Sequence, residues 1–352
     1  MATIRDVAAK AGVSVATVSR VLNASGYADA ATAQRVNEAV EALGYRRNVH
    51  WSRLASQSSR TVLFLLGNRE TMNSMQMRLL VSCEKVLHRE GYDCLFTRHS
   101  YAPDLKANDL ELPRLLAQEG AVDGVILAGI HSENLLKRLD HMKVPYVLLG
   151  SNFVGNEKAL TKNCVLYDDE TGMYEATGHL LRLGHRRIAF IGDRTKGWFE
   201  RRYQGYERAI REAGYEPISV SAPWSVSNVD YGLMAAAELL RGNPAPTAIL
   251  AGNDEIAAGV WKELVRRQIA IPAQISLIGF GDRAEFSILE PALTSVTVFE
   301  EQLGERLATM LLERLANGAK PIASETFPAK LVERHSCGVL REALPLRRPA
   351  RL

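Results

Sequence analysis

Cysteine is scarce in this chain of 352 residues, and none of its cysteines forms a CxxC pair: Cys83, Cys94, Cys164 and Cys337. Disulfide frameworks and zinc sites use cysteines at short, repeated spacings, so this scatter argues against both and favours reduced thiols. No apolar run approaches the roughly 18 residues that a membrane span needs. Charged residues appear at Arg5 and Asp6, where a signal peptide would be apolar. We therefore expect a cytoplasmic protein that does not enter a membrane.

Common catalytic motifs are also missing, because the sequence contains no P-loop, no G-x-S-x-G and no HExxH. Residues 279–284 do spell G-x-G-x-x-A, a dinucleotide-binding pattern. That pattern requires a long helix directly after it, and Pro291 with the short polar run before it leaves no room for one. The sequence gives no support for enzyme activity, a cofactor or a metal site.

Charge is present but unevenly placed. The chain carries a net charge of +3, yet residues 1–60 hold eight Lys and Arg against four acidic residues, and the remainder holds 35 against 36. A basic head on a nearly neutral body suits a polyanionic partner for the head alone. A solvated charged surface would give the same totals, so the helices of the head decide between the two interpretations.

The first 23 residues read as two short helices joined by a tight turn. Apolar residues recur at helical spacing at Ile4, Val7, Ala8 and Ala11. Thr3 can cap this helix, with Asp6 three residues later as a weak capping box. Gly12 can take a positive φ and Ser14 can cap a second helix over residues 15–23. This arrangement is typical of a helix-turn-helix.

The second helix has an inner and an outer face. Val18, Val21 and Leu22 fall on one side, and Ala16 and Arg20 lie roughly opposite. Val15, Thr17 and Ser19 flank the outer face. An outward arginine can bind guanine in the major groove, and small apolar side chains can contact a thymine methyl. The pattern predicts a DNA-recognition helix, with a small helical bundle that has no DNA role as the alternative.

Residues 3–23, TIRDVAAKAGVSVATVSRVLN, and the later LGYRRN closely resemble the headpiece of the lactose-repressor (LacI/GalR) family of bacterial transcription factors. A looser resemblance continues along nearly the whole chain. It implies a homodimer that binds a double-stranded DNA operator of pseudo-palindromic sequence, most often as a repressor, and a small-molecule effector bound in the core. The residues that we expect to contact DNA in the headpiece are Thr3, Ile4, Ser14, Val15, Ala16, Thr17, Ser19, Arg20 and Asn23.

A third helix and a linker follow. Asp29 can cap a helix over residues 30–43, and Gly44 can end it, which completes a headpiece over residues 1–46. Residues 47–59 form the expected linker; in the family this segment is a hinge helix whose leucine enters the minor groove, and Leu54 has that position here. Arg47 replaces the usual proline, and Trp51 replaces a small aliphatic residue. Packing of Leu54 and Trp51 between domains is therefore the alternative.

From residue 60 onward, short apolar strands alternate with amphipathic helices. Strands are expected at 61–66, 92–97, 124–127, 146–149, 187–191, 217–220, 247–250, 276–279, 295–299 and 326–332; helices at 74–90, 113–119, 132–142, 169–183, 200–213, 230–241, 254–267 and 300–315. Such alternation predicts an α/β core, over residues 60–340, of two doubly wound lobes. By resemblance this core is periplasmic-binding-protein-like, with crossings between lobes near 161, 292 and 323. We expect residues 341–352 to be a disordered basic tail.

Doubly wound lobes bind ligands beyond the carboxyl ends of their strands, which places an effector between the lobes. The candidates carried over from the resemblance are Asn68, Arg202, Trp224, Asn253, Asp254 and Asp282. Arg202 matches an effector-binding arginine of the family and Trp224 a stacking aromatic. The alternatives are an exposed helix charge for Arg202, ordinary core for Trp224, and helix capping for Asn253 and Asp254.

The chain also departs from the family at the expected cleft. Gly281 stands where the family has an aspartate, Gly150 ends a strand that often ends in aspartate, and Val298 replaces a frequent glutamine. Fewer acceptors for sugar hydroxyls favour an effector with fewer hydroxyls or an anionic one, such as a sugar acid or a sugar phosphate. The alternative is a constitutive DNA-binding regulator whose cleft has lost its effector.

Overall fold

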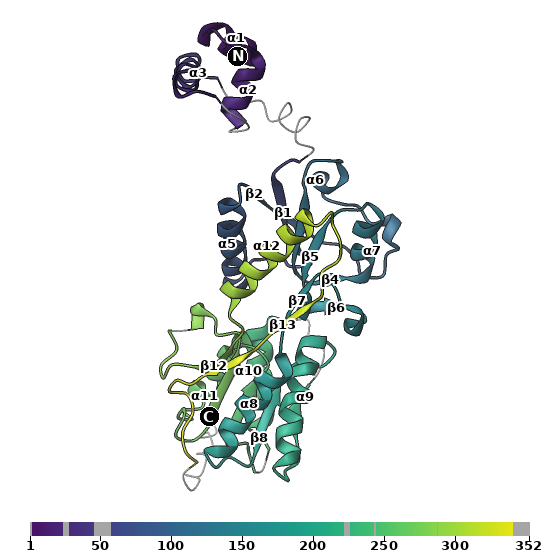
Figure 1. Cartoon of the computed structure of the whole chain (residues 1–352). Coiled ribbons are helices and arrows are strands. Elements are labelled where there is room, and N and C mark those ends of the chain that lie inside the picture. Colours follow the sequence, from purple (N-terminus) through teal and green to yellow (C-terminus); the bar gives the residue numbers. More distant parts are fainter. Residues whose placement is uncertain are drawn as a thin grey trace. The chain divides into compact units, whose positions relative to one another are not determined.

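The computed structural model describes residues 2–23, 28–45, 58–221, 226–242, 244–286 and 288–340. The chain divides into two compact units, Met1–Ser59 and Arg60–Leu352 (Figure 1). Most of the predicted linker, including Leu54, and all of the predicted tail lie outside the described residues. No helix in these ranges is both long and apolar enough to cross a membrane.

In its described residues, 2–23, 28–45 and 58–59, the first unit is a bundle of three helices: α1 (Ile4–Ala11), α2 (Val15–Asn23) and α3 (Ala30–Leu43). Local signals define their ends as the sequence predicts. Thr3 and Asp6 form the capping box of α1, and the side chain of Asp29 accepts a hydrogen bond from the Thr32 amide at 2.8 Å. Gly12 and Gly44 end α1 and α3 at φ values of 65° and 56°. The small core consists of Val7, Ala8, Ala11, Val18, Val36 and Ala39.

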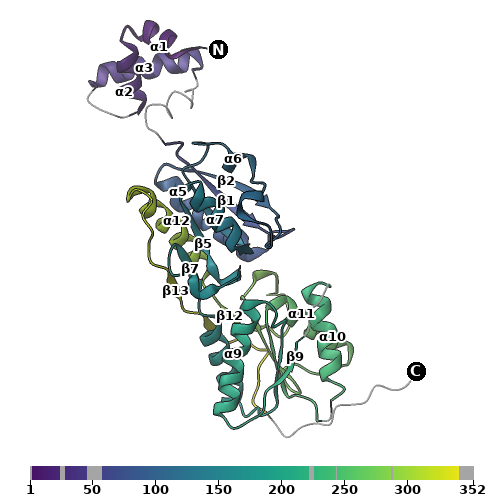
Figure 2. The ribbon, with the colours of Figure 1, turned by 90° about the vertical axis from the view of Figure 1, so that its right-hand side faces the viewer.

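The second unit contains two six-stranded sheets in its described residues, and each sheet with its helices forms one lobe (Figures 1 and 2). The first lobe has the strand order β13-β7-β5-β3-β1-β2, with all neighbours parallel. Its strands are β1 (Thr61–Gly67), β2 (Asp93–His99), β3 (Gly124–Gly129), β5 (Tyr146–Leu149), β7 (Cys164–Tyr167) and β13 (Glu325–Phe327); its helices are α5 (Ser74–Arg89), α6 (Arg114–Ala117), α7 (Glu133–His141) and α12 (Glu300–Ala316).

The second lobe repeats this topology with the order β14-β12-β11-β10-β8-β9, and only β14 is antiparallel to its neighbour. Its strands are β8 (Ile188–Ile191), β9 (Ile218–Val220), β10 (Ala248–Ala251), β11 (Ser276–Phe280), β12 (Thr294–Thr297) and β14 (Lys330–Val332); its helices are α8 (Asp169–Arg182), α9 (Gly197–Glu212), α10 (Asn228–Leu239) and α11 (Asp254–Arg266). Short elements complete the unit: β4 (His131–Ser132), β6 (Phe153–Val154), and 3-10 turns at Ala107–Asp109, Gly150–Asn152, Glu157–Ala159 and Ala284–Phe286.

The central strands are buried along their whole length because helices cover both faces of each sheet. This explains why they appear in the sequence as continuous apolar runs rather than alternating ones. The predicted strands and helices that match one element begin and end within three residues of the observed ones. The predicted strand at 326–332 is in fact two strands, β13 and β14, in different sheets.

The chain crosses between the lobes three times, but later than predicted. The crossings fall after β7, after β12 and between β13 and β14, near residues 168, 298 and 328. The predicted positions 161, 292 and 323 were wrong, because β7 and β12 precede the first and second crossings and the third crossing falls between β13 and β14, which were predicted as one strand. β7 was not predicted although β5, which also has four residues, was, so strand length is not the reason.

Candidate functional site

The outward face of α2 is exposed as the sequence predicts. Val18 is fully buried in the headpiece core, whereas Ala16 and Arg20 are exposed and Val15 is 41% exposed. Ser14 stabilises the start of the helix, since its hydroxyl accepts a hydrogen bond from the Thr17 amide at 3.1 Å. The face therefore presents one arginine and two small apolar side chains, the combination that can contact base edges in a major groove.

The remaining DNA-binding candidates differ in their exposure and in their contacts. Thr3 is exposed and its hydroxyl donates to Asp6 at 2.9 Å, and Thr17 lies with its hydroxyl 2.9 Å from that of Ser14. Ile4 packs partly against the headpiece core, which limits its contact with a ligand. Ser19 is half-buried, and only the backbone of Asn23 is described. Their contacts with DNA stay predictions.

A cavity of about 170 Å³ lies between the two lobes of the second unit. It lies beyond the carboxyl ends of central strands in both sheets, where doubly wound folds bind ligands. The first lobe contributes Arg69, Met75, Gln76, Asn152 and Tyr167. The second lobe and the second crossing contribute Asp193, Lys196, Trp198, Phe199, Arg202, Asn228, Asn253, Phe280, Gly281, Arg283 and Val298.

Arg202, which α9 carries, lines this cavity and is only 6% exposed. Its Nε donates to Asp169 Oδ1 and its Nη1 to the Gly252 carbonyl, both at 2.7 Å. Its guanidinium carbon lies 3.7 Å from the ring centroid of Phe280, a cation–π contact. The alternative of an exposed helix charge is therefore wrong, but protein groups already use two of its nitrogens.

Asp169 is the partner that the sequence analysis missed. Its side chain is fully buried, and Arg201 and Arg202 both form ion pairs with it. Arg201 also donates to the Ser151 carbonyl of the first lobe. In the sequence, Asp168 and Asp169 look like ordinary acidic residues at a helix start, and only the packing of α9 on α8 reveals the ion pair.

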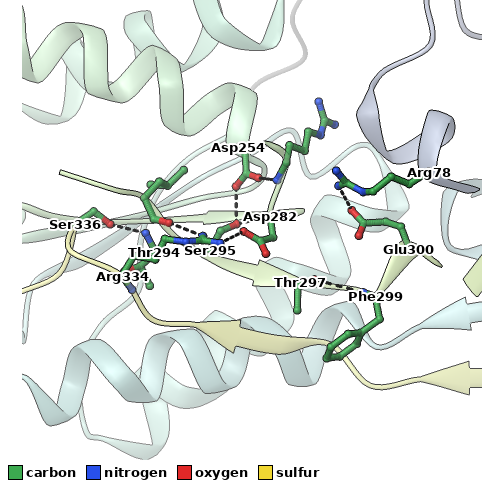
Figure 3. A network of polar contacts seen from close by, with 12 residues as sticks. Arg78, Asp254, Asp282, Thr294, Ser295, Thr297, Phe299, Glu300, Arg334 and Ser336 are labelled. Carbon is green, nitrogen blue, oxygen red and sulfur yellow. Dashed lines mark hydrogen bonds and ion pairs between the residues drawn. The ribbon is translucent and has the colours of Figure 1, made fainter. Parts of the chain in front are cut away.

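The two candidates at the start of α11 differ in position. Asn253 lines the cavity, and its side-chain oxygen caps α11 by accepting from the Ile256 amide at 2.8 Å. Asp254 instead lines a neighbouring cavity of about 250 Å³ and is 1% exposed. Its two oxygens accept from the Ser295 hydroxyl at 2.6 Å and from the Arg283 amide at 2.7 Å (Figure 3). Burial raises the pKa of this carboxyl group to about 6.

Two further candidates do not reach the cavity wall. Asp282 forms an ion pair with Arg334 at 2.7 Å and lines the neighbouring cavity (Figure 3). Asn68 joins two loops, because its side chain accepts from the Tyr101 amide at 2.8 Å and donates to the Ile130 carbonyl at 3.3 Å. The cavity lining thus gives no support to effector contacts by Asp254, Asp282 or Asn68. Trp224 lies outside the described residues.

Most of the charged residues of the cavity wall were not predicted from the sequence. Arg69, Lys196, Arg283 and Asp193 line the cavity, and each follows a strand within a few residues. Their position after predicted strands could have identified these residues from the sequence, because ligand-binding residues of doubly wound sheets cluster after strand ends. Trp198 and Phe199 supply an aromatic wall at the start of α9.

The departures from the family pattern do fall on the cavity. Gly281 and Val298 line it, and neither side chain can accept a hydrogen bond. Asn152, two residues after Gly150, lines it from the first lobe. The wall is therefore short of acidic acceptors at these positions and rich in cations.

The chain combines a helix-turn-helix headpiece that has an exposed recognition face with a two-lobed α/β core that has a cavity between its lobes. This combination defines the class of bacterial DNA-binding transcriptional regulators. The comparisons agree: residues 3–48 match the model described as bacterial regulatory proteins, lacI family, and residues 177–337 match a periplasmic binding protein-like domain. The chain belongs to the LacI family.

Relatives cover nearly the whole chain. The chain is 32% identical to the transcriptional regulator DegA of Bacillus subtilis, and the match covers 96% of this chain and 98% of the relative. It is 31% identical to the transcriptional regulator GalR of Escherichia coli K12, over 96% of both. Both relatives are named as regulators rather than enzymes.

Solved structures share the fold. The lac repressor dimer bound to operator and the anti-inducer ONPF superposes with a TM-score of 0.80 at 23% identity, covering 96% of this chain and 99% of that chain. A complex of the transcriptional regulator CelR with cellobiose gives a TM-score of 0.67 at 26% identity, with coverage of 96% and 100%.

Proposed function

We propose that this protein is a homodimeric repressor that binds a pseudo-palindromic operator in the bacterial cytoplasm, and that a small molecule bound between the core lobes controls its operator affinity. One observation carries the proposal: a cavity lined by both lobes belongs to the same chain as an exposed recognition helix. A ligand that binds one arrangement of the lobes better than another shifts the equilibrium between them. Operator affinity then responds if the headpieces are ordered differently in the two states.

Dimerisation is supported by an exposed apolar surface on the first lobe. Met77 and Val81, one helical turn apart on α5, are 52% and 44% exposed. Phe96, on the adjacent edge strand β2 and on the face of the sheet that α5 covers, is also exposed. An apolar surface at a sheet edge favours pairing with a second copy, and two headpieces read enough base pairs for specificity.

The effector is proposed to be a small carbohydrate derivative, with a sugar acid or a sugar phosphate favoured. A LacI-family regulator of Enterococcus faecium was solved with bound ribose, and CelR with cellobiose, so relatives of this fold hold sugars. In this chain the cavity wall offers Trp198 as an aromatic surface and several cations as donors. The cations distinguish this cavity from one built for a neutral sugar alone.

The linker is proposed to act as in the family, with Leu54 inserted into the minor groove at the operator centre. Insertion of an apolar side chain unstacks a base step and bends DNA. Leu54 lies outside the described residues, so its support is the resemblance alone. Leu54→Ala should reduce operator bending in a gel-phasing assay while the core stays dimeric.

The test starts with DNA. Selection of bound fragments from a random pool should return a motif with two-fold symmetry. A thermal-shift screen of the full chain against a metabolite library should then identify ligands, and those ligands should change the affinity for the selected operator. If no metabolite changes operator affinity, the alternative of a constitutive regulator with a vestigial cleft is correct.

A further inference from the structure

We propose that Arg69 of the first lobe and Arg283 of the second lobe bind one anionic group of a small molecule, a carboxylate or a phosphate, and that this bound anion draws the lobes together. The inference rests on the proposed effector function and names the chemistry and the two residues that couple binding to closure. It assigns to Arg69 and Arg283 the role that the sequence suggested for Arg202.

Arg69 reaches the cavity from the end of the central strand β1. The chain turns at Asn68, whose φ is 47°, and Arg69 follows as a lining residue. Its Nε is buried and has no hydrogen-bond partner, and within the described residues no ion pair involves its side chain. A buried donor without an acceptor costs free energy, more so for a charged group. Such a group is stabilised when a ligand supplies the acceptor.

Arg283 approaches from the loop after β11 and is held in place by several contacts. Its backbone amide donates to the buried Asp254, and its Nη1 pairs with Glu255. The Arg283 side chain is 11% exposed and lines the same cavity as Arg69. Asp254, which Ser295 fixes in turn (Figure 3), is therefore a positioning residue for this arginine.

Positive charge exceeds negative charge around this pair. Among the described residues, four cations line the cavity, Arg69, Lys196, Arg202 and Arg283, against one carboxylate, Asp193. Glu255 is shared, because it accepts from both Arg283 and Asn228. Burial, and then the like charge of Arg283, lower the pKa of Arg69, and the smaller opposing effect of Glu255 does not offset them. The two guanidinium groups thus repel each other across the cleft.

Arg202 cannot replace this pair. Asp169 and the Gly252 carbonyl already occupy its Nε and Nη1, and Phe280 covers one face of its guanidinium. Arginine binds carboxylates and phosphates best through two parallel donors, and an arginine with an unused Nε retains such a pair. In this part of the wall, the unused Nε belongs to Arg69.

The starts of two long helices add to the positive potential. Trp198 and Phe199 at the start of α9, and Asn253 at the N-cap of α11, all line the cavity. Helix N-termini carry partial positive charge and favour anions nearby. An anion between the arginines replaces repulsion between the lobes by attraction from both sides, so binding and closure are coupled.

The experiment uses the full-length chain and defined probes. Thermal unfolding and tryptophan fluorescence are followed during titration with inorganic phosphate, gluconate or glucose, against potassium chloride at matched ionic strength. The wild type should respond saturably to phosphate or to gluconate, and the responding probe tells a phosphate site from a carboxylate site. In R69Q the affinity for that anion should fall at least tenfold.

Two variants complete the design. R89Q removes an exposed arginine at the end of α5, far from the cavity lining, and should bind the anion like the wild type. R69E places a carboxylate opposite Arg283, so it should unfold at a higher temperature than R69Q without any anion and should not respond to phosphate or gluconate. A wild type that ignores both anions, or an equal anion affinity in wild type and R69Q, overturns the inference.

The outcomes separate this inference from the proposed function. If glucose alone binds and changes operator affinity, the effector function stands and the arginine clamp is wrong. If the anion binds through Arg69 but no ligand changes operator affinity, the clamp stands and the effector control of DNA binding is wrong.

Discussion

Arg20 and Arg202 show how one residue type acquires opposite roles at the residue scale. Arg20 is exposed on the outer face of α2, and Arg202 is buried between a carboxylate and an aromatic ring. The N–H groups of an exposed guanidinium are available to donate to a ligand such as guanine, whereas those of a buried guanidinium donate to acceptors within the protein. Substitutions at the two positions should therefore affect different properties.

Arg20→Ala should weaken operator binding by roughly 1–3 kcal/mol per half-site and relax the preference at one base pair, because a base contact is lost. Ser14→Ala is the matched control: it removes the cap of α2 and should weaken binding to all sequences similarly. Selection from a random DNA pool with each variant measures both effects. An unchanged motif for Arg20→Ala would show that another residue reads that base pair.

Arg202→Ala should destabilise the core, while operator affinity without ligand stays nearly intact. The substitution takes one of two partners from the fully buried Asp169, and breaking a buried pair costs about 3–5 kcal/mol. Arg201 remains, so we expect a loss of about 3 kcal/mol in urea unfolding. Arg201→Ala, whose side chain is more exposed, should cost less; equal losses would contradict the assignment of Arg202 as the main partner.

At the element scale, the carboxyl end of β1 depends on a buried histidine. A Cβ on Gly67 would lie 2.2 Å from the His131 ring, so β1 ends in glycine because β4 places an imidazole against it. The His131 Nε2 lies 2.8 Å from the Ala128 carbonyl oxygen, and its Nδ1 lies 3.2 Å from the Tyr101 hydroxyl. The ring therefore links β3, β4 and the segment that follows β2, beside the segment that carries Arg69.

Burial lowers the pKa of His131 from 6.5 to about 4, which predicts a pH dependence of stability. Above pH 6.5 the imidazole is neutral in both the folded and the unfolded chain. As the pH falls from 6.5 toward 4, only the unfolded chain takes up the proton, so the free energy of unfolding should decrease by roughly 3 kcal/mol. Urea unfolding at several pH values measures this decrease.

Other histidines also have lowered pKa values, so a variant is needed to isolate the contribution of His131. His131→Gln keeps a hydrogen-bonding side chain that does not titrate. Its stability should vary less between pH 6.5 and 4 than that of the wild type. An identical pH dependence in both proteins would assign the effect to the other histidines.

At the scale of the whole molecule, assembly should depend on the exposed surface of α5 and β2. Met77→Glu with Val81→Glu should weaken the dimer at least tenfold, because each copy would place carboxylates in an apolar contact. Sedimentation at several protein concentrations measures the dissociation constant. Lys137→Glu, on α7 over the opposite face of the same sheet, is the control and should not change it.

Operator affinity at low protein concentration should fall together with dimerisation, since one headpiece reads only a half-site. A double variant that stays dimeric would move the interface to another surface, for which Met234 and Val265 on the second lobe are the next candidates.

The headpiece is the part of this protein that the sequence by itself determined. Its caps join residues three apart, such as Thr3 with Asp6 and Asp29 with Thr32, and its inner faces follow the helical period. Such signals are local, so they can be recognised in the sequence without knowledge of the tertiary structure. The alternating elements of the core could be predicted for the same reason, with β7 as an exception that its length does not explain, because β5 has four residues as well.

The cleft, in contrast, was decided by the tertiary structure. Arg69 and Arg283 lie more than two hundred residues apart and meet at one cavity because the strands β1 and β11 end at facing edges of two sheets. Asp169 becomes the partner of two arginines only through the packing of α9 on α8. Asp254 and Asp282 match the family pattern, yet hydrogen bonds and an ion pair hold them at a neighbouring cavity. Sequence spacing encodes which face of an element a residue occupies, but which faces meet depends on contacts between distant segments.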